Sequence, residues 1–185
     1  MFTERKAAQI AAFFLLKRGG RMSHLKLMKL MYLADREAMR DYGFPISDDC
    51  AVSMPHGPVL SRTLECIDGN VEPVAGGWES WITDKANHEV ALSHQVTSID
   101  DLDEISPAEI SVMEKVWQEF GHMTRWQIRD YTHDQCPEWQ DPNGSSRPIS
   151  DQDIFRAVGY DAATAKNLSA SLQEQRKLDQ LFGSL

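Results

Sequence analysis

The stretch from Ser23 to Gly43 constrains the fold most, because it is a long helix-forming segment that is apolar on most of its circumference. Ser23 is suited to cap the start of a helix, and Gly43 is suited to the left-handed residue that ends one. At about 100° per residue, the basic side chains of this segment fall on one narrow stripe that we expect to face solvent. They are Lys26, Lys29, Arg36 and Arg40.

Asp35 breaks this pattern, because it lies almost opposite the basic stripe, in the middle of the apolar side. A buried carboxylate is costly unless it accepts hydrogen bonds or pairs with a cation. Another segment must therefore reach it. The segment at 54–62 follows soon afterwards, and His56 and Arg62 are the first partners that we expect for Asp35.

The rest of the chain predicts about six or seven helices, separated by glycines and turn-rich loops. The strongest start is Ser106-Pro107-Ala108-Glu109, in which Ser106 and Glu109 can form a capping box. A short strand is predicted at 50–54, and a hairpin is predicted from strands at 78–83 and 88–93. The fold class is therefore mainly α, or α+β, with a small antiparallel sheet. The predicted helices are 3–17, 23–43, 58–68, 106–120, 124–133, 150–159 and 161–182.

The 185 residues suit one domain, predicted over 1–160, with a helical extension at 161–185 that packs on it or is partly flexible. The formal net charge of −9 argues against a sequence-independent nucleic-acid binder and favours a basic protein partner. No apolar run reaches the length of a membrane span, and the first residues lack the features of a signal peptide. The three widely spaced cysteines are typical of reduced thiols, so a cytoplasmic location is expected.

Metal and catalytic sites have weak signals in this sequence. No pair of cysteines or histidines has CxxC, HxxxH or HExxH spacing, so no metal or other cofactor is expected. His133 with Cys136, or His56 with Ser61, could serve a cysteine or serine hydrolase, but neither set carries a local signature of that chemistry. We favour the interpretation that His56 and Asp35 form a buried structural pair, in which Asp35 accepts from the imidazole or from loop amides. No catalytic residue is therefore predicted, and a hydrolase remains the alternative.

Two loops are rich in turn residues, one at 54–61 and the other at 136–146. Each can be a rigid corner of the fold, or a preformed surface of the kind on which binding residues tend to lie. Trp139 in the second loop can accordingly be a core residue or an aromatic anchor for a partner.

Four ordered motifs extend over nearly the whole chain. They are KLMYLADR at 29–36, MPHGPVLS at 54–61, FGHM at 120–123 and CPEWQDPNGSSRPIS at 136–150. Together, over roughly residues 5–160, they resemble the Panacea domain, which is also called the SocA-like or phage-associated GepA-like domain. Several motifs in matching order are more specific than any one of them.

The resemblance implies a bacterial antitoxin that neutralises a cognate toxin by direct binding, and the acidic charge suggests that the toxin is basic. Little of the chain lies outside the domain, a layout closest to SocA, which also delivers its toxin to the ClpXP protease as a proteolytic adaptor. The resemblance supplies no catalytic residues. A DNA-binding autoregulator is a second alternative, but the acidic charge and the lack of a basic arm argue against it. The residues expected to contact the toxin or to form the core of the motifs are Tyr32, Asp35, Arg36, Pro55, His56, Gly57, Pro58, Ser61, Arg62, Trp139, Asp141, Asn143 and Ser145.

Overall fold

The computed structural model describes residues 1–182, and this part of the chain is mainly helical with two small antiparallel sheets. The predicted fold class is therefore confirmed. The helices are α1 (Glu4–Arg18), α2 (His24–Tyr42), α3 (Ser61–Asp68), α4 (Trp78–Trp81), α5 (Pro107–Phe120), α6 (Arg125–Gln135), α7 (Asp151–Ala157) and α8 (Ala162–Phe182). The strands are β1 (Arg21–Ser23), β2 (Ala51–Met54), β3 (Gly57–Leu60), β4 (Glu89–Ala91) and β5 (Arg147–Pro148), and Ile99–Asp101 forms a 3-10 turn, η1.

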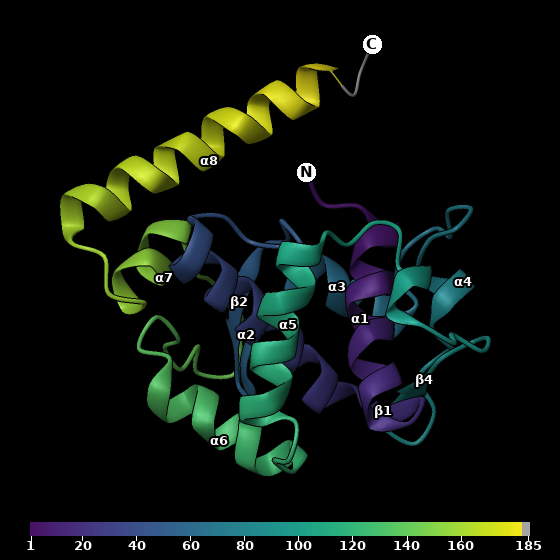
Figure 1. Ribbon diagram of the computed structural model, residues 1–185. Coiled ribbons are helices and arrows are strands. Elements are labelled where there is room, and N and C mark those ends of the chain that lie inside the picture. Colours follow the sequence, from purple (N-terminus) through teal and green to yellow (C-terminus); the bar gives the residue numbers. More distant parts are fainter. Residues whose placement is uncertain (183–185) are drawn as a thin grey trace.

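Helix α2 lies at the centre of the fold, where α1, α5, α6 and β3 pack against it (Figure 1). The predicted solvent-exposed basic stripe is wrong for its first half, because Lys29 is fully buried and Lys26 is only 6% exposed. Lys26 Nζ donates to the carbonyl oxygens of Gly121 and Met123, each over 2.7 Å. Backbone carbonyls thus satisfy a buried ammonium group that the helical period alone would place in water.

The helix starts that depend on local sequence follow the prediction. Thr3 caps α1, and Ser106 and Thr124 form capping boxes with Glu109 and Gln127. Ser23 is the exception, because its side chain makes no capping hydrogen bond. It ends strand β1, which pairs with β4, and the pairing decides the conformation of the chain before α2.

Strands β2 and β3 form a hairpin, and β5 pairs with the other edge of β2. The prediction that a helix begins at Pro58 is wrong, since Pro58 lies opposite Ser53 in the hairpin and α3 begins at Ser61. A proline fixes φ near the value of a helix start, but it is also tolerated at a strand position whose N–H has no ladder partner.

The predicted hairpin at 78–83 and 88–93 is also largely wrong. Residues 78–81 form the single turn α4, which packs against α1 with Trp78 buried. Strand β4 pairs with β1 instead. The two predicted strands meet in one isolated bridge between Ile82 and Leu92, with the backbone hydrogen bonds from Thr83 N to the Ala91 carbonyl and from Ser93 N to the Trp81 carbonyl. The alternation of polar and apolar residues at 78–83 is compatible with a strand and with one helical turn. Burial of the Trp78 indole against α1 favours the helical turn.

Helix α8, predicted at 161–182, extends across the top of the molecule in Figure 1. Its first half packs on α7, where Leu168 and Leu172 join the small apolar cluster around Met39 and Phe155. Further along, Arg176 holds it through Asp48 and Asp151 at 2.7 and 2.6 Å. None of the described helices is long and apolar enough to cross a membrane.

Candidate functional site

Two side chains of α2 converge on a carboxylate more than a hundred residues away. Tyr32 Oη and Arg36 Nε both donate to Glu138 Oε1, over 2.6 and 2.7 Å. The two donors are four residues apart, so they lie on the same side of the helix. The Glu138 side chain is fully buried. Burial, together with the charge of Glu138, raises the pKa of Tyr32 well above its usual value, so the phenol stays protonated and donates.

This contact joins the motif at 29–36 to the motif at 136–150. Tyr32 and Arg36 were among the predicted site residues, but Glu138 was missed. One feature of the sequence singles out Glu138, because it is the only glutamate of the turn-rich loop at 136–146 and lies next to Trp139. What it lacks is any local indication that the carboxylate would be buried.

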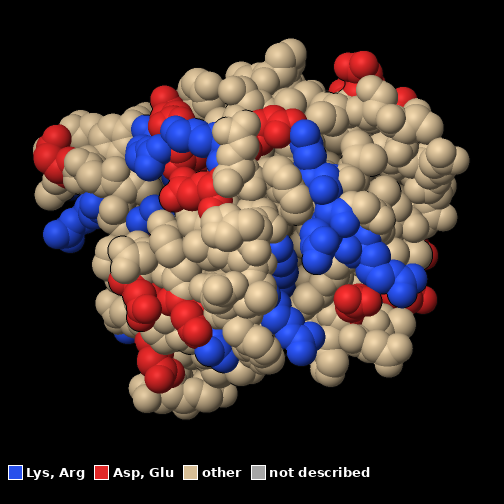
Figure 2. Space-filling view, turned by 60° about the horizontal axis from the view of Figure 1, so that its bottom comes forward, with Lys and Arg blue, Asp and Glu red and all other residues tan. Residues whose placement is uncertain are grey.

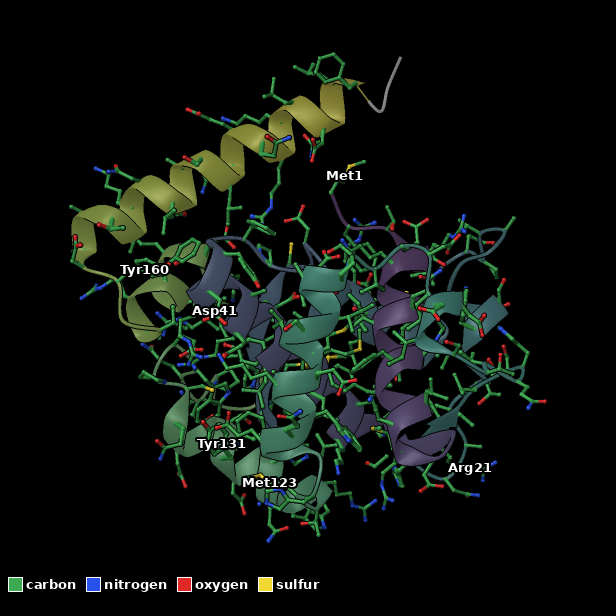
Figure 3. All side chains as sticks on the ribbon, in the orientation of Figure 1. Met1, Arg21, Asp41, Met123, Tyr131 and Tyr160 are labelled. Carbon is green, nitrogen blue, oxygen red and sulfur yellow. The ribbon has the colours of Figure 1, made fainter. Side chains whose placement is uncertain are left out.

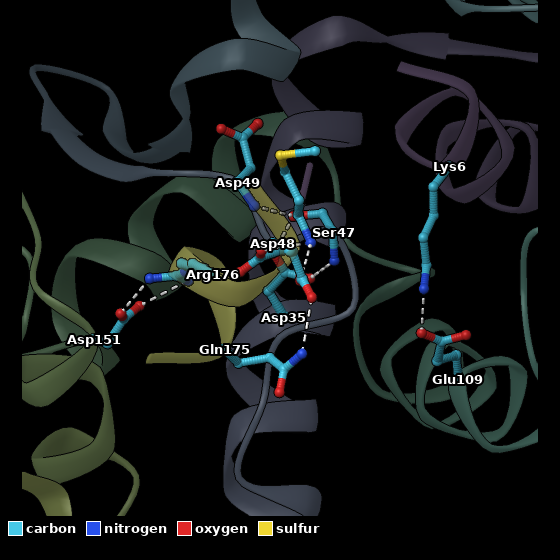
Figure 4. Close-up of polar contacts among 11 residues, drawn as sticks. Lys6, Asp35, Ser47, Asp48, Asp49, Glu109, Asp151, Gln175 and Arg176 are labelled. Carbon is cyan, nitrogen blue, oxygen red and sulfur yellow. Dashed lines mark hydrogen bonds and ion pairs between the residues drawn. The ribbon is translucent and has the colours of Figure 1, made fainter. Parts of the chain in front are cut away.

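Asp35 is buried, as predicted, with 5% of its surface exposed. Its predicted partners are wrong, however, because it accepts hydrogen bonds from Ile46 N at 2.9 Å, from Ser47 N at 2.8 Å and from Ser47 Oγ (Figure 4). The chain reverses after Gly43, so the amides of residues 46 and 47 reach Asp35 before the 54–62 segment can. Burial raises the pKa of Asp35 to about 7, although the hydrogen bonds from Ser47 oppose this shift.

The carboxylate that does hold the 54–62 segment is Asp49, another residue that the prediction missed. It accepts from Arg62 N at 3.0 Å and from both Thr63 N and Thr63 Oγ1 at 2.8 Å. These amides belong to the first turn of α3, whose N-cap residue Leu60 has no side-chain acceptor to offer. Asp49 therefore caps α3 from outside the helix. The Arg62 side chain points away from it, with its guanidinium 4.4 Å from the centre of the Phe2 ring.

The tip of the β2–β3 hairpin packs closely against α2 and α6. Pro55 and His56 are exposed, whereas Gly57 and Pro58 are buried. Lys29 Nζ donates to the Pro58 carbonyl over 2.6 Å. Gly57 has a φ of +95°, and a Cβ there would lie 2.9 Å from both Lys29 Nζ and the Thr132 hydroxyl. Only glycine fits this position, both for its backbone conformation and for the space available.

Trp139 also holds this hairpin. Its Nε1 donates to the Met54 carbonyl over 3.0 Å, and its ring stacks on His133 with 4.1 Å between ring centroids. Trp139 is half-buried, and these contacts are within the fold, as expected for a core residue. The two turn-rich loops of the sequence are thus bound to one another.

The geometry does not favour either hydrolase arrangement. Cys136 is fully buried, and burial followed by the charge of Glu138 raises the pKa of its thiol to about 12, so almost no nucleophilic thiolate forms at neutral pH. His56 and Ser61 lie beyond opposite ends of β3, whose four extended residues span roughly 13 Å. Within residues 1–182, no group of three or more histidine, cysteine or acidic side chains is arranged to hold a metal ion.

The remaining predicted residues lie on the surface beside these contacts. Asp141, Asn143 and Ser145 are exposed on the loop that leads to β5, and Asn143 N donates to Asp141 over 2.8 Å. A polar cleft of about 320 Å³ runs beside this loop. It is lined by Ser53, Pro137, Glu138, Gln140, Arg147, Pro148, Asp153, Arg156 and Ala157.

The sequence matches the family described as antitoxin SocA-like, Panacea domain, over residues 27–140. The chain belongs to this family. The matched region contains α2 from Leu27 onward, the β2–β3 hairpin, α6 and Glu138, and therefore most of the contacts described above. Family membership supports an antitoxin role in general. No curated protein and no solved structure matches the chain.

The charge of this Panacea-domain protein is unevenly distributed. Residues 62–104 contain ten acidic and two basic side chains, so they account for −8 of the net charge of −9. They form α3, α4, β4 and η1, and most of this segment lies beyond α1 at the right of Figure 1. We call this region the acidic side. Glu65, Glu72, Glu79 and Asp84 are exposed there and pair with no cation among the described residues.

Proposed function

We propose that this protein is an antitoxin that neutralises its cognate toxin by direct binding, and that a basic toxin docks on the acidic side. Family membership supports the antitoxin role, and the concentration of negative charge in residues 62–104 is the observation that carries the choice of surface. When the toxin is bound there, the antitoxin covers the basic residues with which the toxin would contact its own target.

The physical argument rests on the carboxylates that have no cation nearby. An exposed ion pair inside one protein contributes little, but a surface of one sign attracts an oppositely charged partner and speeds the encounter. Proteins that act on nucleic acids carry basic surfaces, because they must neutralise phosphates. A toxin of that kind would therefore be attracted to Glu72, Glu79 and Asp84 and would be blocked on its active surface.

We assign two roles to the predicted motif residues. Those that are buried or bonded internally maintain the fold, as Tyr32, Asp35, Gly57 and Trp139 do through the contacts given above. The motif residues on the surface are available for toxin contact or for a later partner. They are Pro55, His56, Arg62, Asp141, Asn143 and Ser145.

A second step, delivery of the bound toxin to the ClpXP protease, belongs to the same proposal. Its support is membership of the SocA-like family, since the resemblance found in the sequence implies that SocA delivers its toxin to this protease. Both steps place the protein in the cytoplasm. The half-life of the toxin, followed in cells with and without ClpX, tests the delivery step separately from neutralisation.

Co-expression with the product of the neighbouring gene tests neutralisation. We expect that product to arrest growth alone, to be harmless with the antitoxin, and to co-purify with it. The triple variant Glu72→Lys, Glu79→Lys, Asp84→Lys should lose rescue. The matched control is Glu119→Lys, Asp134→Lys, Glu174→Lys, which changes the charge equally at exposed positions on α5, α6 and α8 and should still rescue. A harmless neighbour, or equal rescue by both variants, contradicts the proposal.

A further inference from the structure

The acidic protein also carries a basic surface, at the end of the molecule where α2 and α6 begin. Arg18, at the end of α1, and Arg21, at the start of β1, are exposed there and pair with no carboxylate among the described residues. Figure 2 shows Lys and Arg side chains in a band across the middle of this end, which Figure 3 marks with the labels of Arg21 and Met123. Arg18 is close enough to Lys26 to lower the pKa of that lysine, after the larger effect of burial.

A groove of about 320 Å³ opens on this end of the molecule. Four separate parts of the fold form it: the junction of β1 with α2, the tip of the β2–β3 hairpin, the residue before β4, and the first turn of α6. The lining residues are Ser23, His24, Leu25, His56, His88, Arg125 and Trp126. We call this the histidine–tryptophan groove.

Trp126 is the large aromatic residue of the groove, and 47% of its surface is exposed. The guanidinium groups of Arg125 and Arg129 lie over its ring, 5.0 and 4.9 Å from the ring centre. Arg129 is also paired with Asp130, whereas Arg125 has no carboxylate partner among the described residues. A guanidinium stacked on an indole keeps its N–H edge outward, in an orientation that suits a carboxylate.

The groove also contains a serine hydroxyl without a partner in the described part of the chain, and three histidines. Ser23 Oγ is buried and has no hydrogen-bond partner within residues 1–182, an arrangement that a folded protein seldom keeps without a ligand or water. His56 is exposed at the tip of the hairpin, while His24 Nδ1 lies 2.8 Å from the His88 carbonyl oxygen. Imidazole N–H groups are donors that a carboxylate can use.

We propose that the histidine–tryptophan groove binds an acidic segment of a second protein partner, with Arg125 receiving a carboxylate and Trp126 packing against the segment. The inference goes beyond toxin neutralisation, because the groove is basic and aromatic, whereas the proposed toxin surface is acidic. The two surfaces therefore select partners of opposite charge.

A protein segment fits the groove better than a nucleic acid does. Single-stranded nucleic acids need a free aromatic face on which a base can stack, and the guanidinium groups of Arg125 and Arg129 compete for the faces of the Trp126 ring. A peptide side chain needs only the exposed part of the indole, since 47% of the surface of Trp126 is accessible. A long polyanion would also meet the net charge of −9 on the rest of the chain. A short acidic peptide avoids both difficulties, since only its few carboxylates need to enter the basic surface.

Fluorescence anisotropy with the whole protein tests the proposal. The probe is a fluorescein-labelled dodecapeptide of alternating Glu and Ala, compared with the same peptide carrying Gln for Glu and with a labelled oligo(dT) of twelve nucleotides. We expect the Glu peptide alone to bind, with an affinity that falls as salt is added. Arg125→Gln should weaken it about tenfold, the effect of losing one good charge-assisted contact.

Two further variants make the result specific. Trp126→Ala should weaken the Glu peptide as well, and Arg156→Gln, which removes an exposed arginine on α7, should leave its affinity unchanged. The proposal is overturned if the Glu peptide does not bind, if Arg125→Gln binds it as well as the wild type, or if oligo(dT) binds more tightly than the peptide. In the co-expression assay, Arg125→Gln should still rescue growth from the toxin. That result separates the function of this groove from neutralisation, so either proposal can fail without the other.

Discussion

Arg36 Nε donates to Glu138 Oε1 over 2.7 Å, and this ion pair joins the central helix to a loop 102 residues later in the chain. The Glu138 side chain is fully buried and that of Arg36 is 15% exposed, so neither group can turn to water without moving the loop. Tyr32 donates to the same oxygen. The contact explains why the segment from Cys136 to Trp139 is held in place although it contains no regular secondary structure.

Replacing Glu138 with alanine should therefore cost about 3 kcal/mol or more of unfolding free energy, because it leaves the guanidinium of Arg36 buried without its partner. Tyr32→Phe removes one hydrogen bond and should cost about 1 kcal/mol. Urea unfolding at pH 7 measures both changes. A loss below about 1 kcal/mol for Glu138→Ala would show that the pair does not hold the loop.

Asp35→Asn should leave the protein folded but remove one part of the pH dependence of its unfolding free energy. The pKa of Asp35 is raised to about 7, so between about pH 4 and pH 7 the folded state holds a proton that the unfolded state has lost. The unfolding free energy of the wild type therefore falls as the pH rises through this range, and the asparagine variant should lack this component. Stability curves of the two proteins that run parallel from pH 4 to pH 7 would contradict the assignment.

Asp35→Ala is the companion to this variant. It leaves the amides of Ile46 and Ser47 without an acceptor, and each unsatisfied buried group costs about 1–3 kcal/mol. Asparagine keeps an acceptor oxygen at the same place. The alanine variant should consequently be the less stable of the two at every pH.

Lys29→Met should remove a pH dependence of the unfolding free energy in the alkaline range. Burial lowers the pKa of Lys29 to about 7, so between pH 7 and about 10 the unfolded state binds a proton that the folded state does not. The wild type is therefore expected to gain unfolding free energy as the pH rises through this range, relative to the methionine variant. Thermal or urea unfolding at pH 7, 8.5 and 10 measures the difference, and a constant difference would place the lysine ammonium in contact with water.

Thiol reactivity tests the burial of the cysteines. Cys50 is exposed, whereas Cys66 and Cys136 are buried, and burial raises the pKa of each buried thiol to about 12. A disulfide reagent at pH 8 should therefore modify Cys50 in the native protein and all three thiols in guanidinium chloride. Rapid modification of Cys136 in the native state would reopen the hydrolase alternative, since it would require an accessible thiolate.

The features that the sequence predicted well are those decided within a few residues. The capping boxes of Ser106 with Glu109 and of Thr124 with Gln127 need only neighbours three positions apart, and both formed as expected. The central helix and its buried Asp35 also follow from local periodicity. Helical spacing identifies which side of α2 is apolar, and a carboxylate on that side must find donors.

The features that were wrong depend on contacts between distant segments. The burial of Lys29 depends on a carbonyl of the β2–β3 hairpin that no periodicity reveals. The partners of Asp35 were mistaken because the chain reversal at Ile46 and Ser47 is closer than the motif that follows it. Glu138 and Asp49 were missed for the same reason, since each is identified only by the donors that the fold brings to it.

The central claim is that a basic toxin binds the acidic side, and isothermal titration of the purified toxin tests it most directly. We predict that the wild type and the control Glu119→Lys, Asp134→Lys, Glu174→Lys bind the toxin with similar affinity. The variant Glu72→Lys, Glu79→Lys, Asp84→Lys should bind at least about a hundredfold more weakly, a loss of roughly 2.7 kcal/mol. Equal affinity of all three proteins for the toxin would contradict the account.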